Sequence, residues 1–203
     1  MTEVAEEKRR LRASMRELRR SLDAQTQRLH ANQLRGAIQH QSWYKSSVQL
    51  ACYQATDGEI SLDPLIALSW SLDKKVYLPV IAGSGSMLFR EYRRGDKLIP
   101  GRYGIAVPPP GALELDIQEL DLALIPLVAF DLDGYRLGMG GGYYDRALTL
   151  FAGHALASRR HGPLRVGVAH SCQMQNALPR ESWDVRLQRV VTESGPVGIN
   201  QSD

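Results

Sequence analysis

The sequence predicts an α/β fold: a single layered domain in which helices flank a mostly parallel, open sheet, with further helices at the N-terminus. Apolar segments of strand length alternate with segments of helical periodicity, a pattern typical of parallel sheets. The 203 residues are 43% hydrophobic, which is enough for one substantial core. No internal repeat or long linker divides the chain. We therefore expect one domain over residues 1–203, with a frayed tail at 193–203.

Residues 2–20 and 24–40 are the predicted N-terminal helices. In the first, four apolar side chains share one helical face, because they recur at spacings of four, three and four. They are Leu11, Met15, Leu18 and Leu22. A second, basic face has spacings of four, four and three and consists of Lys8, Arg12, Arg16 and Arg19. Ser21 and Asp23 end this helix or cap the next one.

The later elements alternate along the chain. Two more helices are expected at 62–72, which begins with Asp63-Pro64, and at 143–150. Turn-forming residues separate the elements at 56–59 and at 83–86, where a hairpin is expected. The strands are expected at 48–53, 75–81, 87–92, 121–130 in the centre, 165–170 and 189–192.

Composition narrows the class of protein. No apolar run approaches the ~18 residues of a membrane span, and the first ten residues lack the apolar core of a signal peptide. We therefore expect a cytoplasmic monomer without membrane contact. The net charge of +3 is too small to predict a nucleic-acid partner. Cys52 and Cys172 are expected to be reduced thiols, and without CxxC or HExxH no structural zinc site is predicted.

The most informative segment is 136–146, which reads RLGMGGGYYDR. Its four glycines leave backbone N–H groups open to an anion and allow positive φ angles. The segment follows an apolar strand and precedes a helix, which is a favourable position for phosphate. Its spacing fits neither GxxxxGK[ST] nor GxGxxG. A plain flexible turn is the alternative, but the flanking arginines, tyrosines and aspartate favour a ligand loop.

Three other features allow several interpretations. The basic face is a solvated helix surface, a nucleic-acid contact or a clamp for the phosphates of a small ligand. The 57–59 segment is a tight turn, or it presents a carboxylate to a polar heterocycle. Asp145 compensates a helix dipole or binds Mg²⁺, and Asp184 alone is typical of a surface acid. No catalytic role is predicted for His170.

Two adjoining segments, 126–131 and 134–146, together resemble the 5-formyltetrahydrofolate cyclo-ligase family, also called methenyltetrahydrofolate synthetases. Weaker matches follow in the family's order at Lys8 and Arg12, at 58–66, at 76–79 and at 178–184. The resemblance covers residues 8–192. It implies an ATP- and Mg²⁺-dependent enzyme that converts 5-formyltetrahydrofolate to 5,10-methenyltetrahydrofolate with release of ADP and phosphate. Phosphoryl transfer would activate the formyl oxygen, and N10 would then attack.

The resemblance also implies roles for individual residues. Catalytic roles fall on Arg136 and Tyr144, and Mg²⁺ binding falls on Asp145 and Asp184. ATP contacts fall on Lys8, Arg12, Arg136, Gly138, Gly140, Gly141, Gly142, Tyr143 and Tyr144. Folate contacts fall on Glu59, Tyr103, Met139, Gly140 and Tyr143.

The chain departs from the family pattern in two places. Gly141 stands where some members have a lysine, and extra basic residues occur at Arg9, Arg10, Arg19 and Arg20, which are expected to be plain surface. Two rival functions remain open. One is a non-catalytic module that binds nucleotides or nucleic acid, and the other is a related ATP-dependent ligase with a different acceptor.

Overall fold

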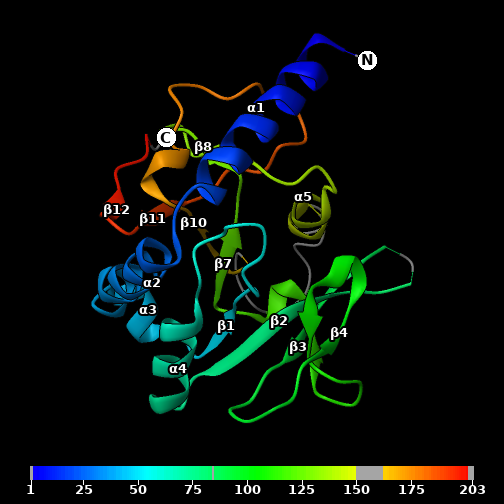
Figure 1. Ribbon diagram of the computed structural model, residues 1–203. Helices are drawn as coiled ribbons and strands as arrows, with labels where there is room; N and C mark the ends of the chain where they lie inside the picture. Colours follow the sequence, from blue (N-terminus) through cyan, green and yellow to red (C-terminus); the bar gives the residue numbers. More distant parts are fainter. Residues whose placement is uncertain (1, 84, 150–161, 201–203) are drawn as a thin grey trace.

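The computed structural model describes residues 2–83, 85–149 and 162–200. An eight-stranded sheet forms its centre, in the order β12-β11-β10-β7-β1-β2-β3-β6 (Figure 1). The five strands from β11 to β2 are parallel. The outer strands β12, β3 and β6 pair antiparallel, and this mostly parallel sheet confirms the predicted α/β class. The strands are β1 (Gln49–Ala51), β2 (Lys75–Ile81), β3 (Met87–Glu91), β6 (Glu114–Leu115), β7 (Leu122–Pro126), β10 (Leu164–Val168), β11 (Arg189–Thr192) and β12 (Gly195–Val197).

The predicted central strand 121–130 is broken. It leaves the large sheet after Pro126, and its last two residues form β8 (Ala129–Phe130), which pairs with β9 (Arg136–Leu137). At the break, the carbonyl of Leu127 accepts hydrogen bonds from the side chains of Arg19 and Gln173. Side-chain donors thus replace the ladder bonds of a continuous strand. A second small sheet joins β4 (Ile99–Pro100) and β5 (Ala106–Val107).

Five α-helices surround the sheet in the described chain. Thr2 and Asp23 cap the first two, since their side chains accept hydrogen bonds from the backbone N–H groups of Ala5 and Thr26. The short α3 was not predicted, and Leu150 at the expected end of α5 lies outside the described residues. The helices are α1 (Glu3–Arg20), α2 (Ala24–Gln39), α3 (Ser42–Ser46), α4 (Asp63–Ser71) and α5 (Tyr143–Thr149). Short 3₁₀ turns occupy η1 (Arg102–Gly104), η2 (Ile117–Glu119) and η3 (Ser171–Gln173).

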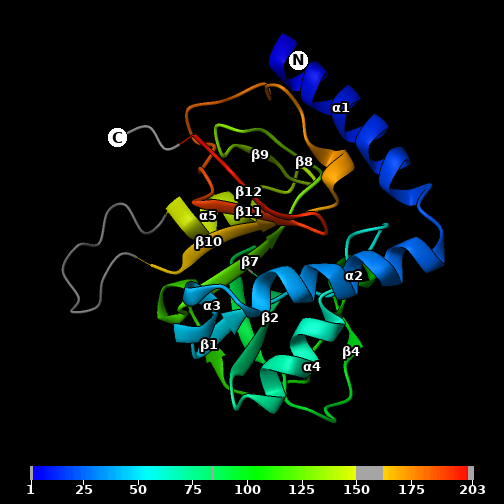
Figure 2. The ribbon, with the colours of Figure 1, turned by 90° about the vertical axis from the view of Figure 1, so that its left-hand side faces the viewer.

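Two apolar cores fill the layers on the two faces of the sheet. Figure 2 shows α2, α3 and α4 in front of the sheet, and α5 lies on the opposite side. Alternate residues of β7 divide between the cores, because successive strand side chains point to opposite faces. Leu122 and Leu124 pack with the α2 and α4 side, whereas Ala123 and Ile125 pack with the α5 side.

Helix α1 differs from the predicted division into faces. Leu11 and Met15 do pack, against a small cluster formed by Ala129, Leu137 and Leu178. Leu18 is 39% exposed, however, whereas Arg19 is fully buried. The surface position expected for Arg19 was therefore wrong. Its guanidinium donates hydrogen bonds to the backbone carbonyls of Asp57 and Leu127, which lie in two loops.

The expected frayed tail contains ordered structure. β12 pairs antiparallel with β11, and the backbone N–H of Asn200 donates to the carbonyl of Leu132. Residues 201–203 lie outside the described part. Cys52 and Cys172 are free thiols, as predicted. None of the described helices combines the length and apolarity needed to cross a membrane.

Candidate functional site

A cavity of about 620 Å³ opens at the carboxyl ends of β1, β2 and β7. Parallel sheets commonly bind ligands at this edge. The glycine segment contributes Gly138, Met139, Gly141, Gly142, Tyr143 and Tyr144 to its wall. Four further predicted residues line it, namely Glu59, Tyr103, Arg136 and Asp145. The fold thus brings ten of the fourteen predicted site residues to one cavity.

The four remaining predicted residues lie beside the cavity without lining it. Arg12 Nε donates to the carbonyl of Gly138 at 2.8 Å, so α1 contacts the glycine segment directly. Lys8 Nζ lies 2.7 Å from Asp184 Oδ2 and 3.0 Å from Glu181 Oε2. Gly140 faces the Arg12 guanidinium, because a Cβ there would stand 3.6 Å from Arg12 Cζ.

The glycine segment depends on its missing side chains. Gly140 and Gly142 have φ angles of +102° and +63°, which strain other residues. At Gly141 a Cβ would stand 2.7 Å from the Tyr143 ring. A side chain at 141 would therefore require that ring to move.

Arg136 and Asp145 form an ion pair at the base of the cavity. Arg136 Nη2 donates to Asp145 Oδ1 at 2.6 Å, and Nη1 donates to the carbonyl of Val185. The Arg136 side chain is buried, with 3% of its surface exposed. This pairing fixes Asp145 through a charge-assisted bond.

The two predicted metal acids each have a cationic partner. Asp145 is paired with Arg136, and Asp184 with Lys8. The described residues contain one group of three potential metal ligands whose ligand atoms lie within 4.8 Å of one another. That group includes neither Asp145 nor Asp184. Mg²⁺ binding by Asp145 and Asp184 stays a prediction.

Two aromatic residues form one rim of the cavity. The hydroxyls of Tyr103 and Tyr143 are 2.9 Å apart. Arg146 lies over the Tyr143 ring at 4.9 Å, and Arg102 lies over the Tyr103 ring at 5.5 Å. Tyr103 is 68% exposed, which leaves one side of this rim open to a ligand.

The Tyr144 hydroxyl is buried and has no hydrogen-bond partner among the described residues. Burial and, next, the Glu59 charge raise the pKa of Tyr144 above its usual value. The hydroxyl therefore stays protonated at neutral pH and can donate a hydrogen bond. An unpartnered buried donor on a cavity wall indicates a group that a ligand satisfies.

Glu59 is a carboxylate of the cavity wall and follows β1 in the chain. Burial raises its pKa, against the opposing effects of the Thr56 N–H and Arg19. Thr56 N donates to Oε2 at 3.0 Å, while Oε1 has Arg19 Nη1 at 3.8 Å. One oxygen is thus held by the turn, and the group is suited to a polar partner in the cavity.

Asp57 lies at the centre of a cationic cluster that the sequence did not reveal. Arg16 Nε and Arg19 Nη2 each donate to Oδ2 at 2.7 Å, and Arg20 donates to Oδ1. Burial alone would raise the pKa of Asp57, but hydrogen bonds from the three arginines hold it well below its usual range. Arg20 lies at the surface as expected, with 54% of its side chain exposed, although its guanidinium is paired with Asp57.

The profile of the 5-formyltetrahydrofolate cyclo-ligase family matches residues 4–193 of this chain. The chain belongs to the 5-formyltetrahydrofolate cyclo-ligase family. It is therefore an enzyme of a ligase family, as the resemblance in the sequence predicted.

Individual relatives agree with this family assignment. The 5-formyltetrahydrofolate cyclo-ligase of Escherichia coli K12 is 40% identical over 148 residues, which cover 71% of this chain and 78% of the relative. That of Haemophilus influenzae is 34% identical and covers 90% of this chain and 95% of the relative. The solved structure of Aquifex aeolicus 5,10-methenyltetrahydrofolate synthetase superposes with a TM-score of 0.81 at 30% identity, covering 97% of this chain and 94% of that one.

Sequence reasoning missed several cavity residues. Arg102, Gln54 and Thr56 line the wall without having been assigned a role, and Arg16 lines it after being named only as part of the basic face. Arg102 directly precedes the predicted Tyr103, and Thr56 lies within the predicted 56–59 turn. Arg102 and Thr56 could thus have been predicted from the neighbouring residues in the sequence, whereas no nearby motif indicated a role for Gln54.

Proposed function

We propose that this chain converts 5-formyltetrahydrofolate to 5,10-methenyltetrahydrofolate, with ATP cleaved to ADP and phosphate and with Mg²⁺ as its metal. One observation carries the proposal: a single cavity joins the glycine segment to Glu59 and to the paired tyrosines. A folate and the phosphates of ATP must meet in one place for a phosphoryl group to pass between them.

The apolar part of the cavity suits the flat folate ring system. Ile81, Met87, Ile105, Val107 and Leu127 line it, while Glu59 offers a carboxylate that a heterocycle can meet with its N–H groups. Glu59 and the Tyr144 hydroxyl therefore orient the heterocycle by hydrogen bonds. Substitution of Glu59 by alanine is expected to raise the KM for folate more than it lowers kcat.

Cations on and beside the cavity wall suit the phosphates of ATP, with Arg102 on the wall and Arg12 and Arg146 beside it. Arg12, Arg102 and Arg146 have no carboxylate partner within the residues described here, so their charges are available to an anion. Backbone N–H groups of a glycine segment add further donors. Arg12 can reach phosphate without leaving an acid unpaired, because its direct partner is the carbonyl of Gly138.

The donor set at the edge of the cavity also fits a hard cation. Mg²⁺ takes one or two carboxylates together with phosphate oxygens and water, and Asp145 and Asp184 supply such carboxylates. When bound, ATP and Mg²⁺ supply the phosphoryl group and the charge neutralisation that turn the formyl oxygen into a leaving group. Arg136 holds Asp145 in position, and Tyr144 keeps its proton to donate toward bound oxygen.

A nucleic-acid-binding role has less support. The basic face of α1 would have to present free charge to phosphates. Lys8, Arg16 and Arg19 instead form ion pairs with Asp184 and Asp57. Most of the charge that favoured this alternative is already neutralised within the protein.

The test is an absorbance assay at the methenyltetrahydrofolate band with purified protein. The proposal predicts a rise that requires 5-formyltetrahydrofolate, ATP and Mg²⁺ together, and that stops when a chelator removes the metal. Matched reactions each omit one component. No rise with all three present, while ATP still binds in a parallel titration, would contradict the folate acceptor and favour another substrate.

A further inference from the structure

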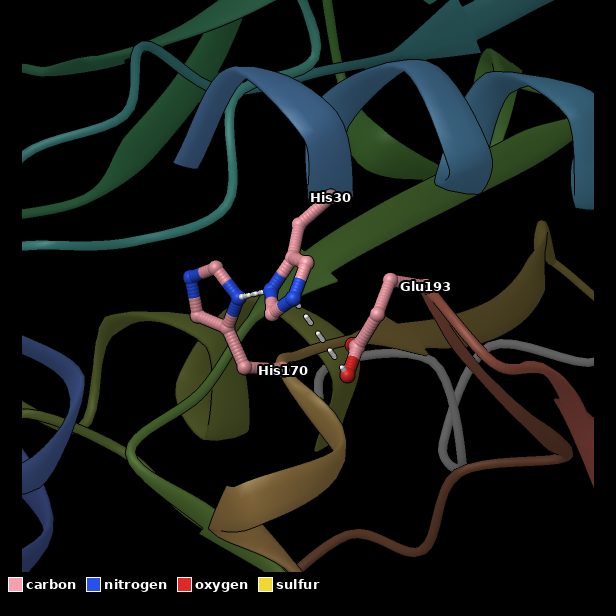
Figure 3. Close-up of side chains that lie close together, drawn as sticks. All are labelled: His30, His170 and Glu193. Atoms are coloured by element: carbon pink, nitrogen blue, oxygen red, sulfur yellow. Dashed lines mark hydrogen bonds and ion pairs between the residues drawn. The ribbon is translucent and has the colours of Figure 1, made fainter. Parts of the chain in front are cut away.

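A cluster of three side chains lies apart from the cavity and has no part in the proposed reaction. His30 comes from α2, His170 follows β10 and Glu193 follows β11 (Figure 3). A ligand atom from each lies within 4.8 Å of the others. The three residues are 23 or more positions apart in the sequence, which is why no short motif revealed them.

His170 is oriented like a metal-binding histidine. Its Nε2 lies 3.2 Å from the carbonyl oxygen of Gly58. A carbonyl can only accept, so Nε2 carries the proton and Nδ1 carries the lone pair. Metal-bound histidines usually donate their second ring N–H to such a partner, which fixes the tautomer and the ring. The Nδ1 lone pair faces His30.

Glu193 is also held in place. Ser171 donates its backbone N–H to Oε2 at 2.9 Å and its hydroxyl to Oε1. The carboxylate side chain is 8% exposed and points to His30, whose side chain is 17% exposed. The cluster thus lies just beneath the surface, where an ion can reach it.

His30 meets an acceptor on each side. Its Nδ1 is 2.8 Å from His170 Nδ1, and its Nε2 is 4.0 Å from Glu193 Oε1. If Nδ1 of a neutral His30 donates to His170, then Nε2 turns a lone pair toward the carboxylate. A cation shared by the three groups removes that conflict, because lone pairs and a negative charge all favour it.

The spacing suits a small divalent ion. Zinc–nitrogen and zinc–oxygen bonds of about 2.0–2.2 Å place tetrahedral ligands about 3.3 Å apart. One ligand atom from each of the three residues lies within 4.8 Å of the others, so the three groups need only a small inward shift to reach that spacing.

We propose that His30, His170 and Glu193 bind one divalent transition-metal ion of the zinc class, with water in a fourth position. Two imidazoles and one carboxylate form a ligand set that this ion commonly takes. The ion would fasten α2 to the loops that follow β10 and β11. Through the bond from His170 to Gly58 it would also brace the turn that carries Glu59.

The probe is Co²⁺ added to metal-free full-length protein, with excess Mg²⁺ present so that hard-cation sites are filled. We expect one Co²⁺ per chain, with the intense visible bands of a tetrahedral N/O site and without thiolate charge-transfer bands. Zn²⁺ should displace the Co²⁺ and raise Tm, since an ion that binds the folded state alone stabilises it.

His30→Gln and Glu193→Gln are the test variants, and His40→Gln is the matched control. His40 lies exposed at the end of the same helix. Loss of an outer partner alone weakens metal binding by about 10–100-fold, so loss of a ligand should weaken it by at least about 100-fold. The control should bind as the wild type does. The proposal would be overturned if the wild type showed no tetrahedral Co²⁺ bands, or if both test variants bound Co²⁺ as tightly as the wild type does.

Discussion

Arginine side chains at two places on helix α1 lie in opposite circumstances. At the C-terminal end of the helix, Arg16, Arg19 and Arg20 converge on the single carboxylate of Asp57. About one turn earlier, Arg12 donates to a backbone carbonyl, that of Gly138, and within the described structure it has the charges of Asp184 and Glu181 nearby but no ion pair. The arginines at the C-terminal end are neutralised by Asp57, whereas Arg12 keeps a charge without an ion pair beside the glycine segment.

This difference separates a structural role from a binding role. A buried cation with a carboxylate partner fastens two elements, because removal of either partner leaves an unpaired charge in the interior. A cation with a neutral partner can meet an anionic ligand at little cost. Basic residues with the same helical spacing therefore have either a structural role or a ligand-binding role on a single helix. Whether the bonding partner is a carboxylate or a neutral carbonyl distinguishes the two roles.

The largest expected effect is on the neutralised end. Asp57→Asn should lower the free energy of unfolding by about 3–5 kcal/mol, because the buried Arg19 then loses its hydrogen-bonded counter-charge and keeps only the more distant Glu59 carboxylate at 3.8 Å. Urea unfolding followed by circular dichroism measures this change. A loss below 1 kcal/mol would show that the cluster does not fasten α1.

The same cluster predicts a pH dependence. The folded pKa of Asp57 lies below the unfolded value of 3.8, so its stabilisation is present above that pH and is lost as the pH falls through the folded pKa. The stability advantage of wild type over Asp57→Asn should therefore be constant from pH 8 to about 5 and shrink below pH 3.8. An advantage that grows on acidification would contradict this sign.

Arg136 is the intermediate case, because it is buried and paired but also lines the proposed active site. Substitution of its partner, Asp145, distinguishes a structural role of the pair from a role in the reaction. Asp145→Ala should lower kcat by well over tenfold, as expected for loss of a charge that positions a transferring phosphoryl group. Steady-state assays with a parallel unfolding curve measure this. A loss of stability without any change in turnover would place the pair with the Asp57 cluster.

The smallest effect is expected at Tyr144. Tyr144→Phe removes a buried hydroxyl that has no partner in the described chain, so stability should stay the same or rise slightly. The KM for 5-formyltetrahydrofolate should rise by roughly tenfold, since one hydrogen bond is worth about 1 kcal/mol or more. A marked loss of stability would mean that the hydroxyl serves the fold instead of the ligand.

The sequence was sufficient for the sheet and for the glycine segment. Apolar periodicity located the core strands, and glycine clustering beside charged residues located the cavity wall. The sequence was not sufficient where the position of a side chain depends on residues that are distant along the chain. The burial of Arg19 depends on Asp57, 38 residues away, and the trio of His30, His170 and Glu193 depends on three separate elements. The strand break after Pro126 likewise depends on donors from distant side chains.

The most direct test of the account measures ATP affinity and stability on the same samples of Arg12→Gln and Arg20→Gln. Arg20 is the matched control, since it lies on the same helix, outside the cavity, and its side chain is 54% exposed. We predict that Arg12→Gln raises the KM for ATP by about 10–100-fold, because a charged hydrogen bond is worth about 1.5–3 kcal/mol, and leaves unfolding unchanged. Arg20→Gln should leave the KM for ATP unchanged. An unchanged KM for ATP in Arg12→Gln, or an equal rise in both variants, would contradict the separation of a ligand-binding Arg12 from the structural arginines around Asp57.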